Sequence, residues 1–587
     1  MYAKRVTTRK AGKIYRYLKL VQSYRDPADG RVRQRLVANL GPEQQLKASG
    51  QLEQLAASFA RLDPPLVGVR REVGPLLLVR HYLERLGLAD IVARALPGRG
   101  RAQLTTAEVV SALIANRLAA PSPLYDIAGW ASSAALNELF GIPAMLLNDD
   151  RLGRALDALA PQAEQIRGAA ALAAIERFGL DAGRLHLDLT ALRVYGAHES
   201  SSLVKAGWSA ERRVRRQVRT LAAATAEGLA LYVRPEPGNA AELVCIGAAL
   251  ERLAKLLPPG LVICADSALG HMSNLCAAAR AELGFVVPLR EASGFRQRYQ
   301  AEVGASALEP LDYVSRRERA LPAQRRTRYR GCVRALPTED AQTGAVHPFA
   351  VAYIWSSEEQ RSVAEARERA LLKAEAALAR VQRGSGGPYY KNAAQIGAKV
   401  ALILAGPVKD LLGVEVIEPA GGEGRPKLRV TRRQEAIAEA ASSDGVYALA
   451  TNLPGPPSAG ELLRIYKEQS LVELRHHDLK APLRVRPLFL HNDDRIAALI
   501  SIVGLALLLF GLIESDLRRA LRADDELAGL LPEGRPARPT GRNILAAFQG
   551  LALTYTAHGI RLDRLTATQR RILQLLKVEL PWPEQAR

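Results

Sequence analysis

Residues 14–40 alternate between polar and apolar positions around a turn, a pattern typical of β-strands. Two such runs within residues 14–40 flank the pair Asp29-Gly30, which favours a tight turn. This stretch therefore predicts a small hairpin unit. From about residue 43 to 180 apolar residues recur at helical spacing instead, as in TTAEVVSALIANRLA, where Thr105 or Thr106 can cap the helix. Within this helical region, residues 123–141 fit either a helix-turn-helix or a plain bundle.

Strand-like runs dominate the next part of the chain, at residues 185–195, 221–233, 261–265 and 285–289, with a helical stretch at 240–257. Strands alternating with helices predict a mixed α/β sheet. Between about 305 and 457 the sequence becomes charged and irregular, and Ser357 opens a long helix that the loop GSGGP closes near residue 383. We expect this block to be an insertion into the α/β domain.

Two more helices, at 458–480 and 495–513, are followed by a tail with helices expected at 540–558 and 567–577. The predicted units are a hairpin (1–42), a helical domain (43–180), a first part of the α/β core (181–304), an insertion (305–457), a second part of the core (458–514) and a helical tail (515–587).

The net charge of the chain indicates what kind of partner it binds. Lys and Arg number 81 against 60 for Asp and Glu, which leaves a formal charge of +21 on 587 residues. Such an excess favours a polyanion, and nucleic acid is the first candidate because its phosphates reward dispersed cations. An acidic membrane surface and simple solubility are the alternatives. The helical domain is accordingly of a DNA-binding or dimerising type.

Other features bear on location. The four cysteines show neither paired nor zinc-ligand spacing, which fits a reducing cytosol, and the basic first twenty residues lack the apolar core of a secretion signal. Residues 496–513 are uncharged and strongly apolar, at the lower length limit for a membrane span. We interpret them as a helix buried on all sides, with a membrane span as the alternative.

Two aspartates follow strand patterns. In LHLDLTALRVY, the residues His186, Asp188 and Thr190 share the face opposite the leucines, so Asp188 projects from a strand. Asp266 ends the apolar run LVICAD, at the edge of a sheet where ligands gather. Taken singly, Asp188 could lie on a solvated sheet face and Asp266 could cap a helix.

A third acidic residue lies in the helix predicted over 458–480, which a capping box of Ser458 and Glu461 opens. At about 100° per residue, its polar side chains form one narrow stripe. The stripe consists of Tyr466, Gln469, Glu473 and Lys480. The alternative is an ordinary exposed face, since every helix needs a polar side.

Asp188, Asp266 and Glu473 could together bind two hard cations, Mg²⁺ or Mn²⁺, for in-line displacement at a phosphodiester. Basic residues flank this set and could follow a DNA backbone. The first group is Lys205, Arg212, Arg213, Arg215, Arg216 and Arg219; the second is Arg316, Arg317, Arg319, Arg325, Arg326, Arg328 and Arg330.

Several motifs carry a family resemblance: VQSYRDPADGRVRQRLVANLG, HLDLT, the pair Gly238-Asn239, VICADSALGHMSN, DGVYALATN and YKEQSLVELRHHDLKAPLRVRPLF. Over nearly its whole length the chain resembles the IS4-like insertion-sequence transposases, most closely the IS1634-type group. In that superfamily the catalytic Glu belongs to a Tyr-x2-Arg-x3-Glu-x6-Lys signature. The chain matches it at Tyr466, Glu473 and Lys480, and departs from it with Gln at position 469.

The resemblance implies an RNase H-like fold, a large insertion before Glu473, and Mg²⁺- or Mn²⁺-dependent DNA transposition. It implies that Lys480 contacts a phosphate near the transposon end and that Tyr466 holds terminal nucleotides. Gln469 can donate hydrogen bonds there but carries no charge. The expected partners are terminal inverted repeats, target DNA and a second copy of the chain, in the cytoplasm and nucleoid of a prokaryote and away from membranes.

Two rival functions share this sequence pattern. One is a domesticated descendant that only binds DNA. The other is an RNase H-like nuclease or resolvase that cuts DNA without joining strands.

Overall fold

The structure of the protein is a computed structural model of residues 1–587. It describes all of them except 1, 11–12, 26–31, 52–53, 55–67, 99–102, 197, 209–212, 257–259, 267–268, 316–317, 407, 419–424, 456, 469, 481–482, 484–489, 522–524 and 586–587. The chain forms two compact units. The first consists of Met1–Arg71, Ala552–Arg564 and Pro581–Arg587, and the second of Glu72–Leu551 and Leu565–Leu580.

The first unit contains the predicted hairpin. Strands β2 (Lys13–Arg25) and β3 (Val32–Pro42) pair antiparallel, as expected, although Asp29-Gly30 lies outside the described residues. A strand that the sequence did not predict, β1 (Tyr2–Lys10), pairs with β2. The short helix α1 (Glu43–Ala48) is tied to β1 because Arg5 donates two hydrogen bonds, of 2.7 and 2.8 Å, to Glu43.

The tail differs from its prediction. A helix was expected over 540–558, but α19 (Gly541–Ala546) is short and strand β17 (Ala552–Thr556) follows it. Gly550, with a φ of 80°, takes the left-handed conformation that ends helices. β17 then lies between β18 (Gly559–Leu562) and β4 (Arg70–Glu72), and the second predicted helix is present as α20 (Ala567–Leu575).

The described part of the helical domain predicted over 43–180 is mainly helical, but it also contains β4, and its residues up to Arg71 belong to the first unit. Thr105 caps α5 through a capping box with Glu108, as its sequence predicted. The helices of the second unit in this region are α3 (Leu76–Leu86), α4 (Leu88–Ala95), α5 (Thr106–Ala119), α6 (Ile127–Ser133), α7 (Leu136–Phe140), α8 (Asp149–Leu159) and α9 (Ala163–Phe178).

A mixed ten-stranded sheet forms the centre of the second unit, which confirms an α/β fold with a large mixed sheet. Its order is β11-β12-β13-β16-β10-β9-β5-β7-β6, with β8 also paired to β7. β5, β9 and β10 run parallel as neighbours, and the other pairs are antiparallel.

The first strands of this sheet are β5 (Arg184–Arg193), β6 (Lys205–Trp208), β7 (Val214–Thr225), β8 (Ala230–Pro237), β9 (Val262–Ala265) and β10 (Gly284–Pro288). The run predicted at 221–233 is thus two strands, because the chain reverses at Gly228, whose φ is 80°. Helices α10 (Glu242–Leu256), α11 (Met272–Arg280) and α12 (Phe295–Glu302) connect or follow these strands.

The stretch predicted as an insertion, 305–457, contributes four strands to the sheet itself: β11 (Glu309–Leu311), β12 (Tyr329–Glu339), β13 (Val346–Ser356) and β16 (Val446–Thr451). A smaller subdomain lies between β13 and β16, with a separate core around Leu378 and Ile396. Its elements are α13 (Ser357–Gly384), α14 (Ala393–Leu404), β14 (Leu412–Ile417), β15 (Lys427–Arg432) and α15 (Gln434–Ala441).

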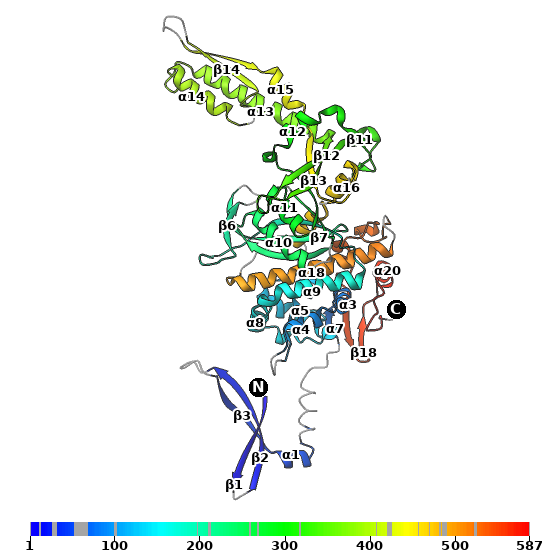
Figure 1. The fold of residues 1–587 in the computed structure, drawn as a ribbon. Helices are drawn as coiled ribbons and strands as arrows, with labels where there is room; N and C mark the ends of the chain where they lie inside the picture. The colour runs from blue at the N-terminus through cyan, green and yellow to red at the C-terminus, as the bar shows by residue number, and fades with distance from the viewer. Residues whose placement is uncertain are drawn as a thin grey trace. The chain divides into compact units, whose positions relative to one another are not determined.

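The apolar helix is α18 (Asp493–Ala520), which lies between strand β8 and helices α5, α8 and α9 (Figure 1). By length and composition it could cross a membrane, but 94% of its apolar window is buried inside the protein. The interpretation as a buried helix is therefore supported. Gly504 permits the close approach of α18 to β8, because a Cβ atom there would lie 2.9 Å from Val233 Cβ.

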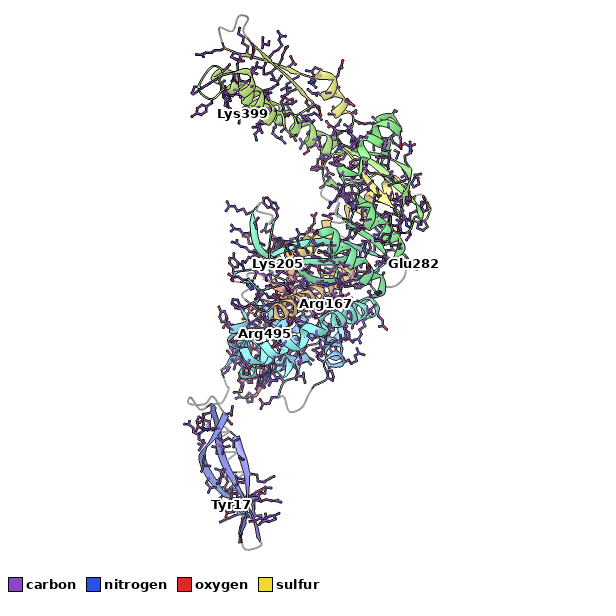
Figure 2. All side chains as sticks on the ribbon, turned by 60° about the vertical axis from the view of Figure 1, so that its left-hand side comes forward. Tyr17, Arg167, Lys205, Glu282, Lys399 and Arg495 are labelled. Atoms are coloured by element: carbon purple, nitrogen blue, oxygen red, sulfur yellow. The ribbon has the colours of Figure 1, made fainter. Side chains whose placement is uncertain are left out.

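Polar side chains fix the register of α18 against the helical layer. Arg167 of α9 donates to Ser501 of α18, and Arg495 of α18 donates to Asp157 of α8 at 2.7 Å. Both arginines are labelled in Figure 2. α18 thus links the helices of the N-terminal half to the sheet.

Candidate active site

Asp188 and Asp266 occupy matching positions on neighbouring strands. β5 and β9 run parallel, and their last paired residues are Leu187 and Ala265. Each aspartate directly follows that last paired residue of its strand, and paired strands lie about 4.8 Å apart. The tertiary structure thus brings together two carboxylates that are far apart in sequence, and Asp266 influences the titration of Asp188.

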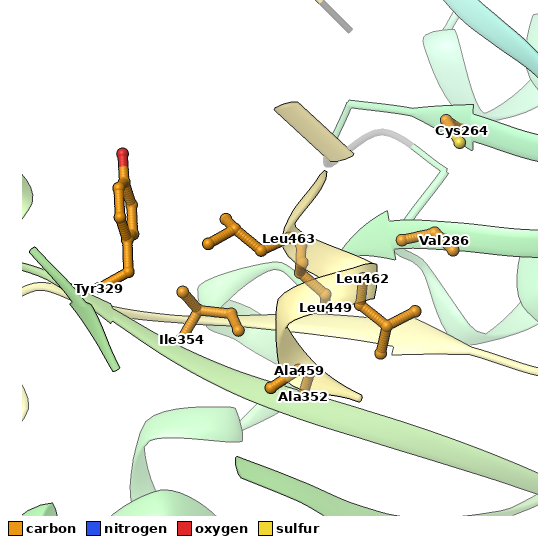
Figure 3. Packing of buried hydrophobic residues seen from close by; sticks show 9 residues of the cluster. All are labelled: Cys264, Val286, Tyr329, Ala352, Ile354, Leu449, Ala459, Leu462 and Leu463. Carbon is orange, nitrogen blue, oxygen red and sulfur yellow. The ribbon is translucent and has the colours of Figure 1, made fainter. Parts of the chain in front are cut away.

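The helix predicted over 458–480 is two helices, so the prediction of one continuous helix is wrong. α16 (Ala459–Lys467) begins at the expected capping box and packs Leu462 and Leu463 against β10, β12 and β13 (Figure 3). α17 (Ser470–Lys480) packs instead on β5 and β7. The two helices cover different parts of the sheet, and the polar stripe is divided between them.

α17 and the end of α16 cover the face of β5 that carries Asp188. His186 Nε2 lies 3.7 Å from a carboxylate oxygen of Glu468, which also accepts a 2.8 Å hydrogen bond from Arg184. Further along the strand, Lys480 donates to the hydroxyl of Thr190. Asp188 lies between His186 and Thr190 on this face of the strand. Its side chain therefore faces the middle of the helical segment, where Glu473 is exposed.

The electrostatics of Asp188 report this convergence. Burial is the largest cause that raises the pKa of Asp188 to about 7. The carboxylates of Asp266 and Glu473 add to the rise, while a backbone hydrogen bond from Leu189 and the ammonium group of Lys480 oppose it. Like charges are therefore concentrated here, as in sites that bind divalent cations.

Tyr466 lies beside the acidic residues, on α16. Burial, followed by the carboxylates of Asp266 and Glu473, raises the pKa of its hydroxyl. Its ring lies 6.1 Å from that of Tyr447, and Lys467 Nζ lies 6.0 Å from its centroid. The hydroxyl is thus held near the carboxylates by an aromatic group on the sheet.

The first predicted basic segment lies on the β6–β7 hairpin. Arg213 and Arg216 are exposed and Arg215 is half-buried, whereas Arg212 lies outside the described residues. Arg216 is six residues along β7 from Ala222, the partner of Asp188 across the pair. This corresponds to about 20 Å of strand, so these arginines do not touch the acidic trio directly.

The second basic segment precedes and enters β12. Arg325 and Arg328 are exposed, but Arg326 donates hydrogen bonds to the backbone carbonyls of Leu321 (2.8 Å) and Arg319 (3.0 Å). Arg326 therefore stabilises its own loop. Gln469, the departure from the superfamily signature, lies outside the described residues.

Among the residues that the structure describes, Cys276, Asp340 and His347 form one tight group of possible metal ligands, with ligand atoms within 4.8 Å of one another. Arg280 pairs with Asp340 and already balances its charge, so this group ties α11 to the β12–β13 turn. The acidic trio is not so tight a group.

Sequence reasoning missed two buried charged residues, Arg475 of α17 and Glu514 of α18. Their side chains are 3% and 2% exposed. Glu514 did leave a signal, because it is the first charge after eighteen uncharged positions in the apolar helix. A lone buried charge on such a helix needs a partner from elsewhere in the fold.

Two family models match the parts of the chain that carry these features. The model of the IS1634 family transposase N-terminal domain matches residues 3–65. The model of the transposase DDE domain matches residues 181–509, more than half of the chain, including Asp188, Asp266 and Glu473. The chain is a DDE transposase of the IS1634 type. The expectation of an insertion-sequence transposase is thereby confirmed.

Between these matches, residues 70–166 of the transposase match a domain family of unknown function, DUF4277. A search of curated proteins finds no match to the chain. As a DDE enzyme the transposase cleaves nucleic acid and acts on DNA, and DDE domains generally depend on divalent metal.

Proposed function

We propose that Asp188, Asp266 and Glu473 bind the catalytic metal of this transposase. The observation that carries the proposal is the approach of the three carboxylates from β5, the end of β9 and α17 on one face of the sheet. In this proposal the enzyme cuts at the terminal inverted repeats of its element and joins the freed 3′ hydroxyl to target DNA.

The donor set fits two hard divalent cations, Mg²⁺ or Mn²⁺. Carboxylate oxygens are the ligands these ions prefer, and the raised pKa of Asp188 reflects burial first and then repulsion from Asp266 and Glu473, which a cation would relieve. When bound, such ions activate the attacking oxygen and stabilise the departing one.

Two reactions would share the site. In cleavage, a water oxygen forms a bond to phosphorus, and the bond from phosphorus to the 3′ oxygen breaks. In strand transfer, that 3′ hydroxyl attacks a target phosphodiester and the target's own 3′ oxygen leaves. Both are in-line displacements at phosphorus, so one set of carboxylates serves both.

The neighbouring residues would grip the DNA. Lys480, whose ammonium group lies close enough to Asp188 to lower its pKa, would contact a phosphate near the reacting bond. Tyr466 would hold terminal nucleotides, and Gln469 would donate hydrogen bonds there. Along the backbone further away we place the basic segments, with Arg212, Arg213, Arg215, Arg216, Arg325, Arg326 and Arg328.

The wider organisation follows from the same proposal. A mixed sheet with acidic residues on β5 and after β9 supports an RNase H-like core. The N-terminal sheet and the helical domain would bind DNA or a second subunit, and two copies would pair the two ends. The burial of α18 supports a protein that works away from membranes, in the cytoplasm of a prokaryote and on its nucleoid.

The deciding experiment is a cleavage and strand-transfer assay with candidate end sequences and Mg²⁺ or Mn²⁺. Asp188→Asn should lower both activities by about a thousandfold or more, because several kcal/mol of charge stabilisation depend on the metal. DNA binding should remain, since Asp188 adds no positive charge to the interface. Unchanged cutting by this variant would refute the assignment.

The same assay separates the rivals. A wild-type protein that binds the ends but neither cuts nor joins would be a domesticated DNA-binding protein. One that cuts generic or branched DNA without joining strands would be a nuclease or resolvase.

A further inference from the structure

α17 carries charged side chains on two opposite faces. Glu473 is exposed on the face that meets Asp188, and Lys480 on the same face donates to Thr190. Arg475 follows Glu473 by two positions, which is about 200° around a helix. Its side chain is 3% exposed, so α17 is held between the acidic site and a buried contact behind it.

The guanidinium of Arg475 is engaged on several sides. Nη2 and Nη1 donate to the two carboxylate oxygens of Glu514 at 2.8 and 3.2 Å, and Nη1 donates to Asp478 at 2.9 Å. Nε donates to the carbonyl of Gly228, in the turn that joins β7 to β8. One side chain thus connects α17 to the sheet and to α18.

The anchor at the other end is itself fixed. Glu514 belongs to the buried helix α18 and is 2% exposed. It also accepts a hydrogen bond of 2.8 Å from the backbone of Gly541 and pairs with Arg518 one turn further along α18. Because α18 is enclosed by the sheet and the helical layer, Glu514 offers an anchor point that cannot follow movements of α17.

This arrangement controls the position of Glu473. α17 has only eleven residues, and a helix of that length depends on tertiary contacts for its placement. A forked guanidinium that holds two oxygens of one carboxylate fixes both the rotation of the helix and its shift along the axis. The carboxylate of Glu473, on the opposite side, moves with any change in either.

We propose that Arg475, held by Glu514 and the Gly228 carbonyl, is a positioning residue that sets the location of Glu473 relative to Asp188 and Asp266, and thereby the metal affinity of the site. The inference rests on the proposed function, since it assigns metal binding to the same trio. It adds a buried ion pair through which the core of the protein controls that binding.

The test is Arg475→Lys, which keeps the charge but loses the fork. Binding of Mn²⁺ alone to the full-length protein is followed by the loss of the free-ion paramagnetic resonance signal. We expect the dissociation constant for Mn²⁺ to rise about 10- to 100-fold, the usual effect of losing a group that orients a ligand. The metal concentration for half-maximal cleavage should rise in parallel, while the variant stays folded at the assay temperature and binds DNA about as tightly as the wild type.

Arg518→Lys is the matched control, because Arg518 pairs with the same Glu514 carboxylate from within α18 and not from α17. Its Mn²⁺ affinity should change much less than that of Arg475→Lys. If Arg475→Lys does not fold, Glu514→Gln replaces it, since the amide keeps the shape but removes the ion pair, and the same rise is expected.

A folded Arg475→Lys or Glu514→Gln variant with wild-type Mn²⁺ affinity overturns the inference. Failure of the proposed function looks different, because there Asp188→Asn would retain Mn²⁺ binding and cleavage whatever happens at Arg475.

Discussion

Two clusters of charge lie on opposite sides of α17, and they are built differently. On one side Asp188, Asp266 and Glu473 gather three carboxylates near Lys480, and the pKa of Asp188 rises to about 7. On the other side two arginines and two acidic residues alternate in a buried, hydrogen-bonded network. That network consists of Arg475, Asp478, Glu514 and Arg518.

The difference shows how a proposed metal-binding site can be distinguished from a charge network that holds the fold together. Charges that hold elements together are balanced by partners, because an unpaired buried charge is costly. An excess of like charge is tolerated only where something else, here a divalent cation in our proposal, completes it. The two clusters therefore differ in whether neighbouring charges have the same sign, as around Asp188, or opposite signs, as around Arg475.

The functional difference between the two clusters is tested most directly by neutralising one carboxylate in each. Glu473→Gln should lower cleavage by about a thousandfold or more, since it removes a proposed metal ligand. Asp478→Asn should lower cleavage by less than about tenfold, because it weakens only the support. Single-turnover cleavage of end DNA measures both variants.

Unfolding by denaturant should rank these variants in the opposite order. Glu473→Gln should leave the stability equal or higher, whereas Asp478→Asn should lower it, because Arg475 loses a partner. Equal losses of cleavage in both variants would mean that the two clusters are not functionally distinct.

The next effect concerns pH in the metal-free protein. A carboxyl with a folded pKa of about 7 and an ordinary unfolded pKa of about 4 holds its proton more tightly when folded. Its ionisation therefore destabilises the fold, and this loss of stability grows as pH rises from about 4 to about 7. Asp188→Asn should raise the melting temperature by a few degrees at pH 8 and by less at pH 5.

Added Mg²⁺ provides the control, because in our proposal it stabilises the wild type at pH 8 but not the variant. A melting-temperature difference that stays constant across pH would contradict a raised pKa for Asp188.

The smallest expected effect compares two neighbouring arginines. Arg325 is exposed, whereas Arg326 donates to carbonyls of its own loop. If Arg325 touches a phosphate, Arg325→Ala should weaken DNA binding and reduce the slope of log affinity against log salt by about one. Arg326→Ala should change that slope less. Fluorescence anisotropy titrations measure both slopes, and a larger change in Arg326→Ala would mean that Arg326, and not Arg325, contacts the phosphate.

Local patterns predicted many elements correctly. The alternation around Asp188 predicts β5, the apolar run before Asp266 predicts β9, and the capping motifs at Thr105 and Ser458 mark true helix starts. These signals succeed because they depend on a few adjacent residues whose backbone preferences agree with the fold.

Predictions from longer continuous patterns were wrong where contacts with distant elements determine the secondary structure. The helix expected over 458–480 divides because α16 and α17 cover different strands. The stretch 305–457 contributes strands to the central sheet, and part of the helix expected at 540–558 becomes β17, which pairs with β18 and β4. Strand partners lie far away in sequence, so no local window contains them.

The sequence by itself determined which residue types this transposase has for its chemistry: three carboxylates, a Tyr and a Lys at signature spacing, and a large positive charge. Only the tertiary structure decided which charges face one another. The parallel register of β5 and β9 places Asp188 beside Asp266, and the buried pair of Arg475 and Glu514 fixes the helix that carries Glu473. The reason is physical: a side chain's charge is a local property, but its compensation depends on neighbours that only folding brings near.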